Sequence, residues 1–428
     1  MLDRTIAPEI KQIDHFSIMQ PECMQMKNGI PLHVIKTGNE DVIRFDILIK
    51  GGQWNQSQPL QAMLTNRMLR EGTCRWTSSQ IAEKLDYYGA WLETSSSVNY
   101  GFITLYSLGK YFPQTVEIVA SMIKEPAFPE HELGVIIDVN RQRFKVNAER
   151  VDVMARKQLN KALFGKKHPL GRLAELSDYD NINSTVLQDF YRTYYHSDNC
   201  SLYVSGNVTR EIICCIEQCF GCEKWGDNSN VYALNDFKPA TDSRRYIFVE
   251  KEDAVQSSLK MGGFFMHQTD LDFLKTRVLI TLFGGYFGSR LMSNIREDKG
   301  YTYGIGAGLV CYPDVSLLGI STEAANEYID KVIEEIGNEI DRLHSEKVSF
   351  LELEMVKNYM IGEMCRNYEG AFSLSDAWIY IETFGLPSNF MECSLQAIRE
   401  ITPDDLLSLS QKYLCKENLI AVVAGKKV

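Results

Sequence analysis

A long internal repeat limits what this chain can fold into more than any other feature of its sequence. Residues 182–206 match residues 401–425 at a constant offset of 219, without gaps. In both copies the pattern predicts a capped helix, a short turn that contains Asn, and an apolar strand that ends in Gly. The matching residues are Leu187 and Leu406, Tyr194 and Tyr413, Asn199 and Asn418, and Gly206 and Gly425. Such a repeat indicates two copies of one domain of about 200 residues.

Glycines repeat in a similar way earlier in each half, at an offset of 211. The matching glycines are Gly51-Gly52 and Gly262-Gly263, and Gly89 and Gly300. Each Gly-Gly pair is expected to follow a strand of alternating apolar and polar residues.

The two copies of the repeated domain and the stretch that joins them divide the chain of 428 residues into three parts. We expect an N-terminal domain over residues 1–225, a linker over residues 226–241 and a C-terminal domain over residues 242–428. The linker range is polar, the composition of an exposed connection between domains. A chain of this length is also too long for one hydrophobic core.

The order of the expected elements indicates the fold class. The first half should contain strands near residues 31–36 and 42–50, helices near 58–69 and 78–88, strands near 90–96 and 100–106, and long helices over 112–163. In the second half the strongest helix pattern covers residues 326–343, whose apolar residues fall on one stripe. Pairs of strands followed by runs of helices predict an α+β fold. We therefore expect two homologous layered domains in a clamshell arrangement, each an antiparallel-rich mixed sheet packed with helices.

Composition excludes several classes of partner. A net charge of −11 disfavours nucleic acid, because binding to its phosphates requires a basic face. No segment is apolar over the length that a membrane helix needs, and residues 1–12 lack the apolar core of a signal peptide. Eleven scattered cysteines show no disulfide framework, which favours a reducing compartment. These features predict a cytoplasmic protein without a membrane or nucleic-acid partner.

Four of the cysteines lie close together, at positions 214, 215, 219 and 222. Cys215, Cys219 and Cys222 would share one face of a helix, which could hold a soft metal. Alternatively, these thiols pack the helix onto a sheet. The packing alternative is favoured, since a structural zinc usually draws its ligands from two separated pairs.

Short motifs in a fixed order cover almost the whole chain and together resemble the pitrilysin/insulinase superfamily of zinc metallopeptidases, the inverzincins. They are Glu71-Gly72-Thr73, Ser79-Gln80-Ile81, Tyr88-Gly89-Ala90, Phe164-Gly165 with His168-Pro169-Leu170-Gly171, residues 282–285, residues 289–291 and residues 296–303. In this family an H-x-x-E-H helix binds zinc through its two His, and its Glu activates water. The resemblance places that helix on residues 63–67.

At those positions the sequence has lost every metal-binding group. Met63, Asn66 and Arg67 replace the first His, the Glu and the second His, and the third ligand falls near Arg143. A thioether is a poor ligand for catalytic zinc, and a guanidinium has no lone pair to offer. Two guanidinium groups would also repel a divalent cation, and Asn cannot take a proton from water. The sequence thus predicts no metal or cofactor in this chain, with zinc only in a partner, and a helix kept as scaffold.

The resemblance also implies a substrate-binding pair in the second half. The family carries an Arg and a Tyr seven residues apart that reach the substrate at the zinc, and this chain keeps both as Arg296 and Tyr303. Arg offers a rigid donor fork to a peptide carbonyl or carboxylate, and a Tyr hydroxyl can stabilise an oxyanion. Without the resemblance, the residues would be interpreted as an exposed Arg and a half-buried strand Tyr.

The sequence thus lacks the zinc ligands of the family but keeps its Arg and Tyr. This combination predicts a non-catalytic, peptide-binding subunit of a heterodimeric zinc metallopeptidase that acts on unfolded peptides. Its partner would be a homologous chain that bears the zinc, as in bacterial members of the superfamily that divide the site between two chains. This chain would be inactive alone. The alternative is a structural or assembly subunit that resembles the core proteins of respiratory complexes or the metal-free partner of the processing peptidase. A homodimeric peptide-binding protein is the third and less favoured interpretation.

Overall fold

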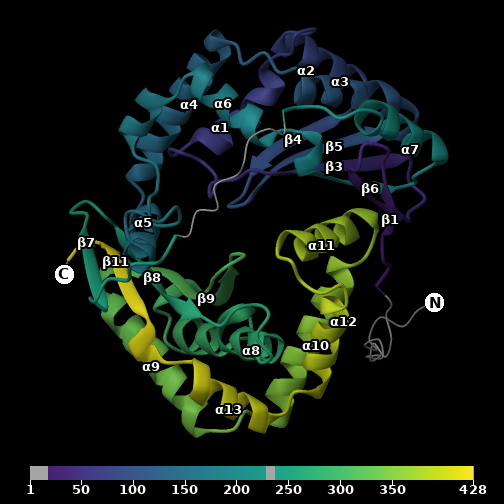
Figure 1. Ribbon diagram of the computed structural model, residues 1–428. Helices are drawn as coiled ribbons and strands as arrows, with labels where there is room; N and C mark the ends of the chain where they lie inside the picture. The colour runs from purple at the N-terminus through teal and green to yellow at the C-terminus, as the bar shows by residue number, and fades with distance from the viewer. Residues whose placement is uncertain (1–17, 228–236, 428) are drawn as a thin grey trace, which may run out of the picture.

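A computed structural model describes residues 18–227 and 237–427. Residues 1–17 and the central part of the expected linker, residues 228–236, lie outside the described residues. The described chain forms two layered halves, each a mixed sheet packed against helices (Figure 1). The expected α+β class with two layered domains is confirmed. Within the described residues, no helix is long and apolar enough to cross a membrane.

Six strands from the first half form one sheet within the described residues, in the order β1-β2-β6-β3-β5-β4. The strands are β1 (Glu22–Gln25), β2 (Pro31–Lys36), β3 (Val42–Lys50), β4 (Trp91–Ser96), β5 (Tyr100–Leu108) and β6 (Cys200–Gly206). Only β2 and β6 pair in parallel, and the other neighbours are antiparallel. Every residue of β6 is buried, as expected for a central strand that is covered on both faces.

The described residues of the first half contain seven α-helices. They are α1 (Gln61–Met68), α2 (Ser78–Tyr87), α3 (Phe112–Lys124), α4 (Glu130–Ala148), α5 (Val151–Phe164), α6 (Ser184–Tyr194) and α7 (Arg210–Ile216). Helix α2 begins with a full capping box between Thr77 and Gln80, which satisfies two backbone N–H groups. Helix α1 begins later than the sequence predicts, because Leu60 has a φ of 73°, in the left-handed region.

The second sheet has five described strands in the order β7-β11-β8-β10-β9. These are β7 (Tyr246–Glu250), β8 (Gln256–Phe265), β9 (Thr302–Cys311), β10 (Ser316–Ala325) and β11 (Ile420–Gly425). The sequence placed Gly262-Gly263 after a strand, and the structure places both inside β8. A Cβ on Gly263 would lie 2.7 Å from the carbonyl oxygen of Asn418. Gly is therefore needed there for close backbone approach.

The helices of the second half are α8 (Phe273–Ile280), α9 (Ile329–Ser345), α10 (Phe350–Asn367), α11 (Ala371–Thr383), α12 (Phe390–Glu400) and α13 (Pro403–Tyr413). The apolar stripe predicted over residues 326–343 is confirmed as the buried face of α9, after a 3₁₀ turn at Asn326–Tyr328. Two π-helical segments, η6 (Thr281–Gly285) and η7 (Met292–Asp298), follow α8.

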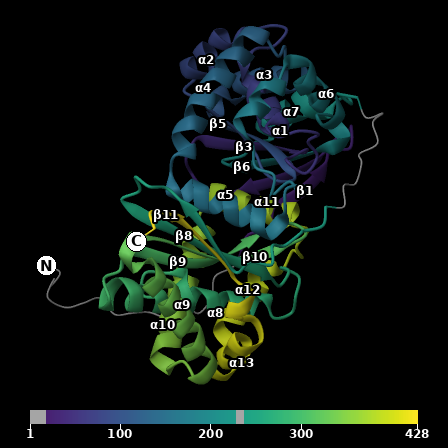
Figure 2. The ribbon, with the colours of Figure 1, turned by 90° about the vertical axis from the view of Figure 1, so that its left-hand side faces the viewer.

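Each half also supplies one helix to the sheet of the other half. Helix α5 packs on β8 and β11 through Leu159 and Leu163, which share a buried cluster with Ile420 and Val422. Helix α11 packs on β6 and β2 of the first sheet. Shifted by 219, residues 151–164 become residues 370–383, so the repeat relates α5 to α11 within one residue. Figure 2 shows both helices between the two layers.

Polar contacts fix α11 to the first sheet. The Tyr203 hydroxyl of β6 donates a hydrogen bond of 2.6 Å to Glu382 of α11. The Arg44 guanidinium of β3 donates one of 2.6 Å to Asp376 on the same helix. Hydrogen bonds to charged groups are stronger than neutral ones, so these contacts and the exchanged helices interlock the two halves.

Candidate functional site

The three residues that replace the zinc motif lie on α1 and have different environments. Met63 is half-buried and packs against the core of the first half, so it serves as scaffold. Asn66 is buried, with 1% of its surface exposed. Arg67 is exposed and makes no hydrogen bond or ion pair with any described residue.

Asn66 is held in a polar pair inside the core. Its Nδ2 donates a hydrogen bond of 3.2 Å to the hydroxyl of Tyr195, which is fully buried. Burial raises the pKa of Tyr195 well above its usual range, so this hydroxyl stays neutral. A Cβ on Gly101 would lie 2.9 Å from both polar atoms, so glycine makes room for the pair. The Oδ1 atom of Asn66 has no hydrogen-bond partner among the described residues.

Arg67 and Arg143 are positively charged residues at two of the positions where the sequence predicts metal ligands. Burial raises the pKa of Glu71, and the charges of Arg70 and Arg67 oppose that rise. Arg143 lies on α4 and lines a cavity with residues of α5 and of segment 173–179. No hydrogen bond or ion pair in residues 18–227 and 237–427 joins Arg143 to the three residues on α1.

These residues do not fit a zinc ion. The groups that α1 presents are a thioether, an amide and a guanidinium, whereas zinc requires imidazole, thiolate or carboxylate ligands. Across the described chain, no three His, Cys, Asp or Glu side chains come together in a group that could hold a metal. The cysteines at positions 214, 215, 219 and 222 are likewise not part of such a group. Cys215 and Cys219 pack against the first core, and the π-helical turn Glu217–Gly221 interrupts the helix that they were expected to share.

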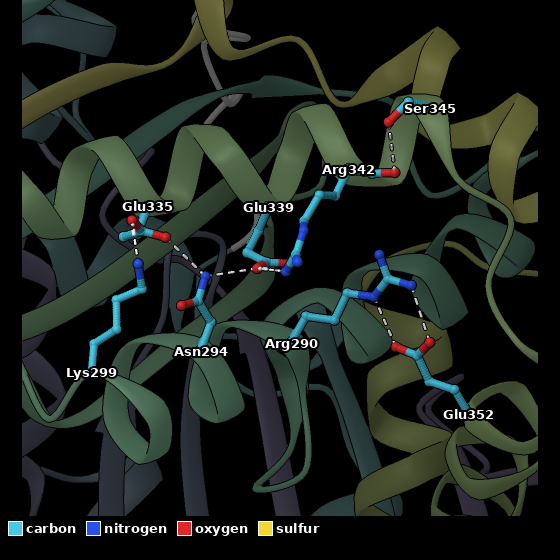
Figure 3. Close-up of polar contacts among 8 residues, drawn as sticks. All are labelled: Arg290, Asn294, Lys299, Glu335, Glu339, Arg342, Ser345 and Glu352. Atoms are coloured by element: carbon cyan, nitrogen blue, oxygen red, sulfur yellow. Dashed lines mark hydrogen bonds and ion pairs between the residues drawn. The ribbon is translucent and has the colours of Figure 1, made fainter.

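Arg296 lies on η7, which is tied firmly to α9. Asn294 on η7 donates hydrogen bonds of 3.0 Å to Glu335 and 2.7 Å to Glu339 (Figure 3). Lys299 pairs with Glu335 at 2.6 Å, and Arg342 pairs with the buried Glu339 at 2.9 Å. A buried carboxylate with two donors is stable only in one arrangement, so the network holds η7 in place.

A bidentate ion pair fixes the residues that precede η7. The guanidinium of Arg290 donates two hydrogen bonds, of 2.8 and 3.0 Å, to Glu352 on α10 (Figure 3). The side chain of Arg296 itself remains half-exposed. Its guanidinium carbon lies 4.6 Å from the ring centre of Phe287, and its ion pair with Glu297 is long, at 4.0 Å. The Arg296 guanidinium is therefore oriented by an aromatic ring and available to a ligand.

Tyr303 lies at the start of β9, and 97% of its surface is exposed. Its hydroxyl makes no hydrogen bond with another described residue. Without the family resemblance, Tyr303 would be interpreted as a half-buried strand residue, and the structure shows an exposed one instead. Arg296 and Tyr303 flank the short turn between η7 and β9, where Gly300 has a φ of 66°. The two side chains thus lie on adjoining elements of one rigid unit.

Sequence reasoning missed Phe287, which is 64% exposed beside Arg296. The aromatic residues between glycines in residues 284–288 were the available signal, because glycines mark a tight turn that can present a ring at the surface. A cavity of about 600 Å³ also lies beside β9. Its lining includes Arg277, Asp376 and Tyr380, together with Gly308 and Leu309 of β9.

Two family models match consecutive parts of the chain. The insulinase model of peptidase family M16 matches residues 39–174, and the model described as the peptidase M16 inactive domain matches residues 181–360. Only residues 175–180 separate the two matches. The chain belongs to peptidase family M16, the pitrilysin/insulinase superfamily. The resemblance of the short motifs is thereby confirmed.

Some relatives in family M16 are named as proteases and others as inactive proteins. An uncharacterized zinc protease of Rickettsia felis is 24% identical over 413 residues, which cover 93% of this chain and 96% of that protein. A probable inactive metalloprotease of Bacillus subtilis, YmfF, is 22% identical over 242 residues, covering 56% of this chain and 55% of that protein. The peptidase M16 inactive domain of Pseudomonas fluorescens has the same fold, with a TM-score of 0.84, 19% identity, and coverage of 96% and 99%. With α1 as described, this chain is a non-catalytic member of family M16.

Proposed function

We propose that this chain is the peptide-binding subunit of a heterodimeric zinc metallopeptidase that acts on unfolded peptides. The observation that carries the proposal is a half-exposed Arg296 and an exposed Tyr303 on a rigid scaffold, in a chain whose α1 presents no zinc ligand. The partner is a homologous chain with an intact H-x-x-E-H helix. This chain then contributes to hydrolysis only within the complex.

An edge strand supports binding of an extended peptide. Strand β9 is at one end of the second sheet in the described structure, so one side of its backbone is open to pairing. Gly304 and Gly308 have no atom within 4 Å of a Cβ placed on them, which leaves the strand accessible. Arg296 offers donors to a peptide carbonyl, and the Tyr303 hydroxyl is available to a developing oxyanion at the partner's metal.

We place the protein in the cytoplasm. Its eleven cysteines, all within the described residues, are free thiols, which supports a reducing compartment.

Reconstitution with a zinc-bearing partner tests the proposal. Co-expression with a homologous H-x-x-E-H chain should give peptide hydrolysis that neither chain shows alone. Arg296→Ala and Tyr303→Phe should each lower turnover by about tenfold or more, since each removes a transition-state donor. Arg210→Ala on α7 and Tyr87→Phe on α2 are matched controls at exposed positions and should leave turnover unchanged. Full turnover in both site variants would contradict the role given to the pair.

A further inference from the structure

One segment of the chain has a charge opposite to that of the whole. Residues 141–172 contain ten Lys and Arg and two acidic residues, a local charge of +8 in a chain of net charge −11. The segment covers the second half of α4, all of α5 and the loop that follows. Such a concentration of one sign attracts ligands of the other sign.

The cations of this segment line two neighbouring cavities. One, of about 480 Å³, lies between α4, α5 and residues 173–179, and its lining includes Arg143, Arg156 and Lys157. The other, of about 450 Å³, adds Lys161, Lys166 and Arg172 and reaches Val249 of β7, and its lining also includes the carboxylates of Glu175 and Asp178. Both are lined by Met154, Lys157 and Leu173, so they are adjacent. We call the two together the basic cavities.

Most of these charges are not neutralised by the protein. Arg143, Arg156, Lys161 and Lys166 form no hydrogen bond or ion pair with the described residues. Lys157 donates only to a backbone carbonyl, that of Ala174 at 3.4 Å. Arg172 forms a long ion pair of 3.7 Å with Asp178, and its own side chain is exposed. Several unpaired donors that converge on a concave surface favour an anionic ligand.

Aromatic and aliphatic side chains complete the lining. Phe144 and Tyr179 meet edge to face at 6.1 Å, and the ammonium of Lys157 lies 5.5 Å from the Phe144 ring centre. Val153 and Met154 add further apolar surface. A ligand that fits must therefore carry apolar groups as well as negative charges. An acidic peptide has both, whereas a long nucleic acid would extend over the negative remainder of the chain.

We infer that the basic cavities bind the acidic side chains of peptide substrates, so that the subunit selects peptides rich in Asp and Glu. The inference rests on the proposed peptide-binding function and names its substrate class. Arg143, at the position expected for the third metal ligand, contributes to this selection as a cation. The cavities lie where α5 joins the two halves, since α5 packs on the second sheet and Val249 of β7 lines one of them.

The test measures binding of three labelled peptides of equal length, one rich in Glu, one neutral and one rich in Lys, to the full chain by fluorescence anisotropy. The acidic peptide should bind at least about tenfold more tightly than the others, and its affinity should fall as salt is added. Arg143→Gln and Lys161→Gln should each weaken the acidic peptide by about three- to tenfold without affecting the neutral one. Arg143→Glu with Lys161→Glu should abolish the preference. Arg210→Glu, the same reversal at an exposed site on α7, is the control and should keep it.

The outcomes separate two kinds of failure. If none of the three peptides binds, the proposed function itself is contradicted. If the neutral or basic peptide binds as tightly as the acidic one, or the Gln variants keep full selectivity, the basic cavities do not select substrate. A single-stranded DNA oligonucleotide should compete poorly with the acidic peptide. Stronger competition by DNA through the same cations would overturn the assignment to peptides.

Discussion

At the position where the sequence analysis places the catalytic Glu of family M16, this chain has the buried amide of Asn66. Asn66 pairs with Tyr195 at 3.2 Å beneath the first sheet, and the small Gly101 leaves space for both groups. The residue has thus become part of the hydrogen-bonded core. The contribution of the Asn66–Tyr195 pair to the free energy of unfolding can be measured directly.

Tyr195→Phe removes the hydroxyl that Asn66 contacts and leaves the buried amide without this partner. The substitution should lower the free energy of unfolding by about 1–3 kcal/mol, the cost of an unsatisfied buried polar group. Urea unfolding of the purified chain measures the difference. Tyr87→Phe, on a side chain that is 82% exposed, should change it little. Equal stability of all three proteins would show that the Asn66–Tyr195 pair does not stabilise the fold.

The identities of Met63, Asn66 and Arg67 are enough to argue that these positions offer no zinc ligand, because ligand chemistry does not depend on the fold. These identities are not enough to predict the surroundings of the three side chains in the folded chain. Nothing in the sequence near Asn66 indicates that Tyr195, 129 residues away, would be its partner. The basic cavities were missed because the net charge of the whole chain hides the +8 of residues 141–172.

Among the elements, those governed by local interactions were predicted best. The predicted helices near residues 78–88 and within 401–425 both begin with a capping box, at Thr77 and Thr402, and a capping box acts within four residues, so the sequence contains all of its information. The Gly-Gly pair inside β8 was misplaced because its cause is a contact with Asn418, far along the chain. The exchange of α5 and α11 was not predicted, since an apolar helix face does not specify which sheet it will cover.

The contact of α11 with the first sheet should be sensitive to acid. His33 of β2 lies between Cys23 of β1, Tyr203 of β6 and Glu382 of α11. Burial lowers its pKa below 6.5, against the opposing charge of Glu382. The unfolded chain therefore takes up this proton first, and the stability that neutral His33 provides is lost as the pH falls below about 6.5.

Urea unfolding between about pH 7.5 and pH 5 measures this effect. The free energy of unfolding should decrease toward low pH, and His33→Gln should make the decrease smaller. Buried His168 and His196 have pKa values that burial lowers in the same direction, so part of the slope should remain. His131→Gln, at an exposed site on α4, is the control. An unchanged slope in His33→Gln would show that this histidine does not couple α11 to acid.

At the scale of the whole molecule, the two halves have diverged in chemistry while keeping one architecture. The repeat at offset 219 extends from α6 and β6 to α13 and β11, and includes the reciprocal pair α5 and α11. The first half presents Met63, Asn66 and Arg67 where the sequence predicts the zinc motif, and the second half presents a half-exposed Arg296 and an exposed Tyr303. An interlocked chain of this kind presents its binding groups on a rigid body, which suits a subunit that completes the site of another chain.

Native mass spectrometry of the complex purified from its source distinguishes a peptidase subunit from a structural one, because it reports the partner and the bound metal together. We predict one copy of this chain, one homologous chain with an intact H-x-x-E-H helix, and zinc that remains with the partner when the two are separated. A stable complex with no peptidase chain in it would favour a structural or assembly role. Zinc bound to this chain in isolation would contradict the account.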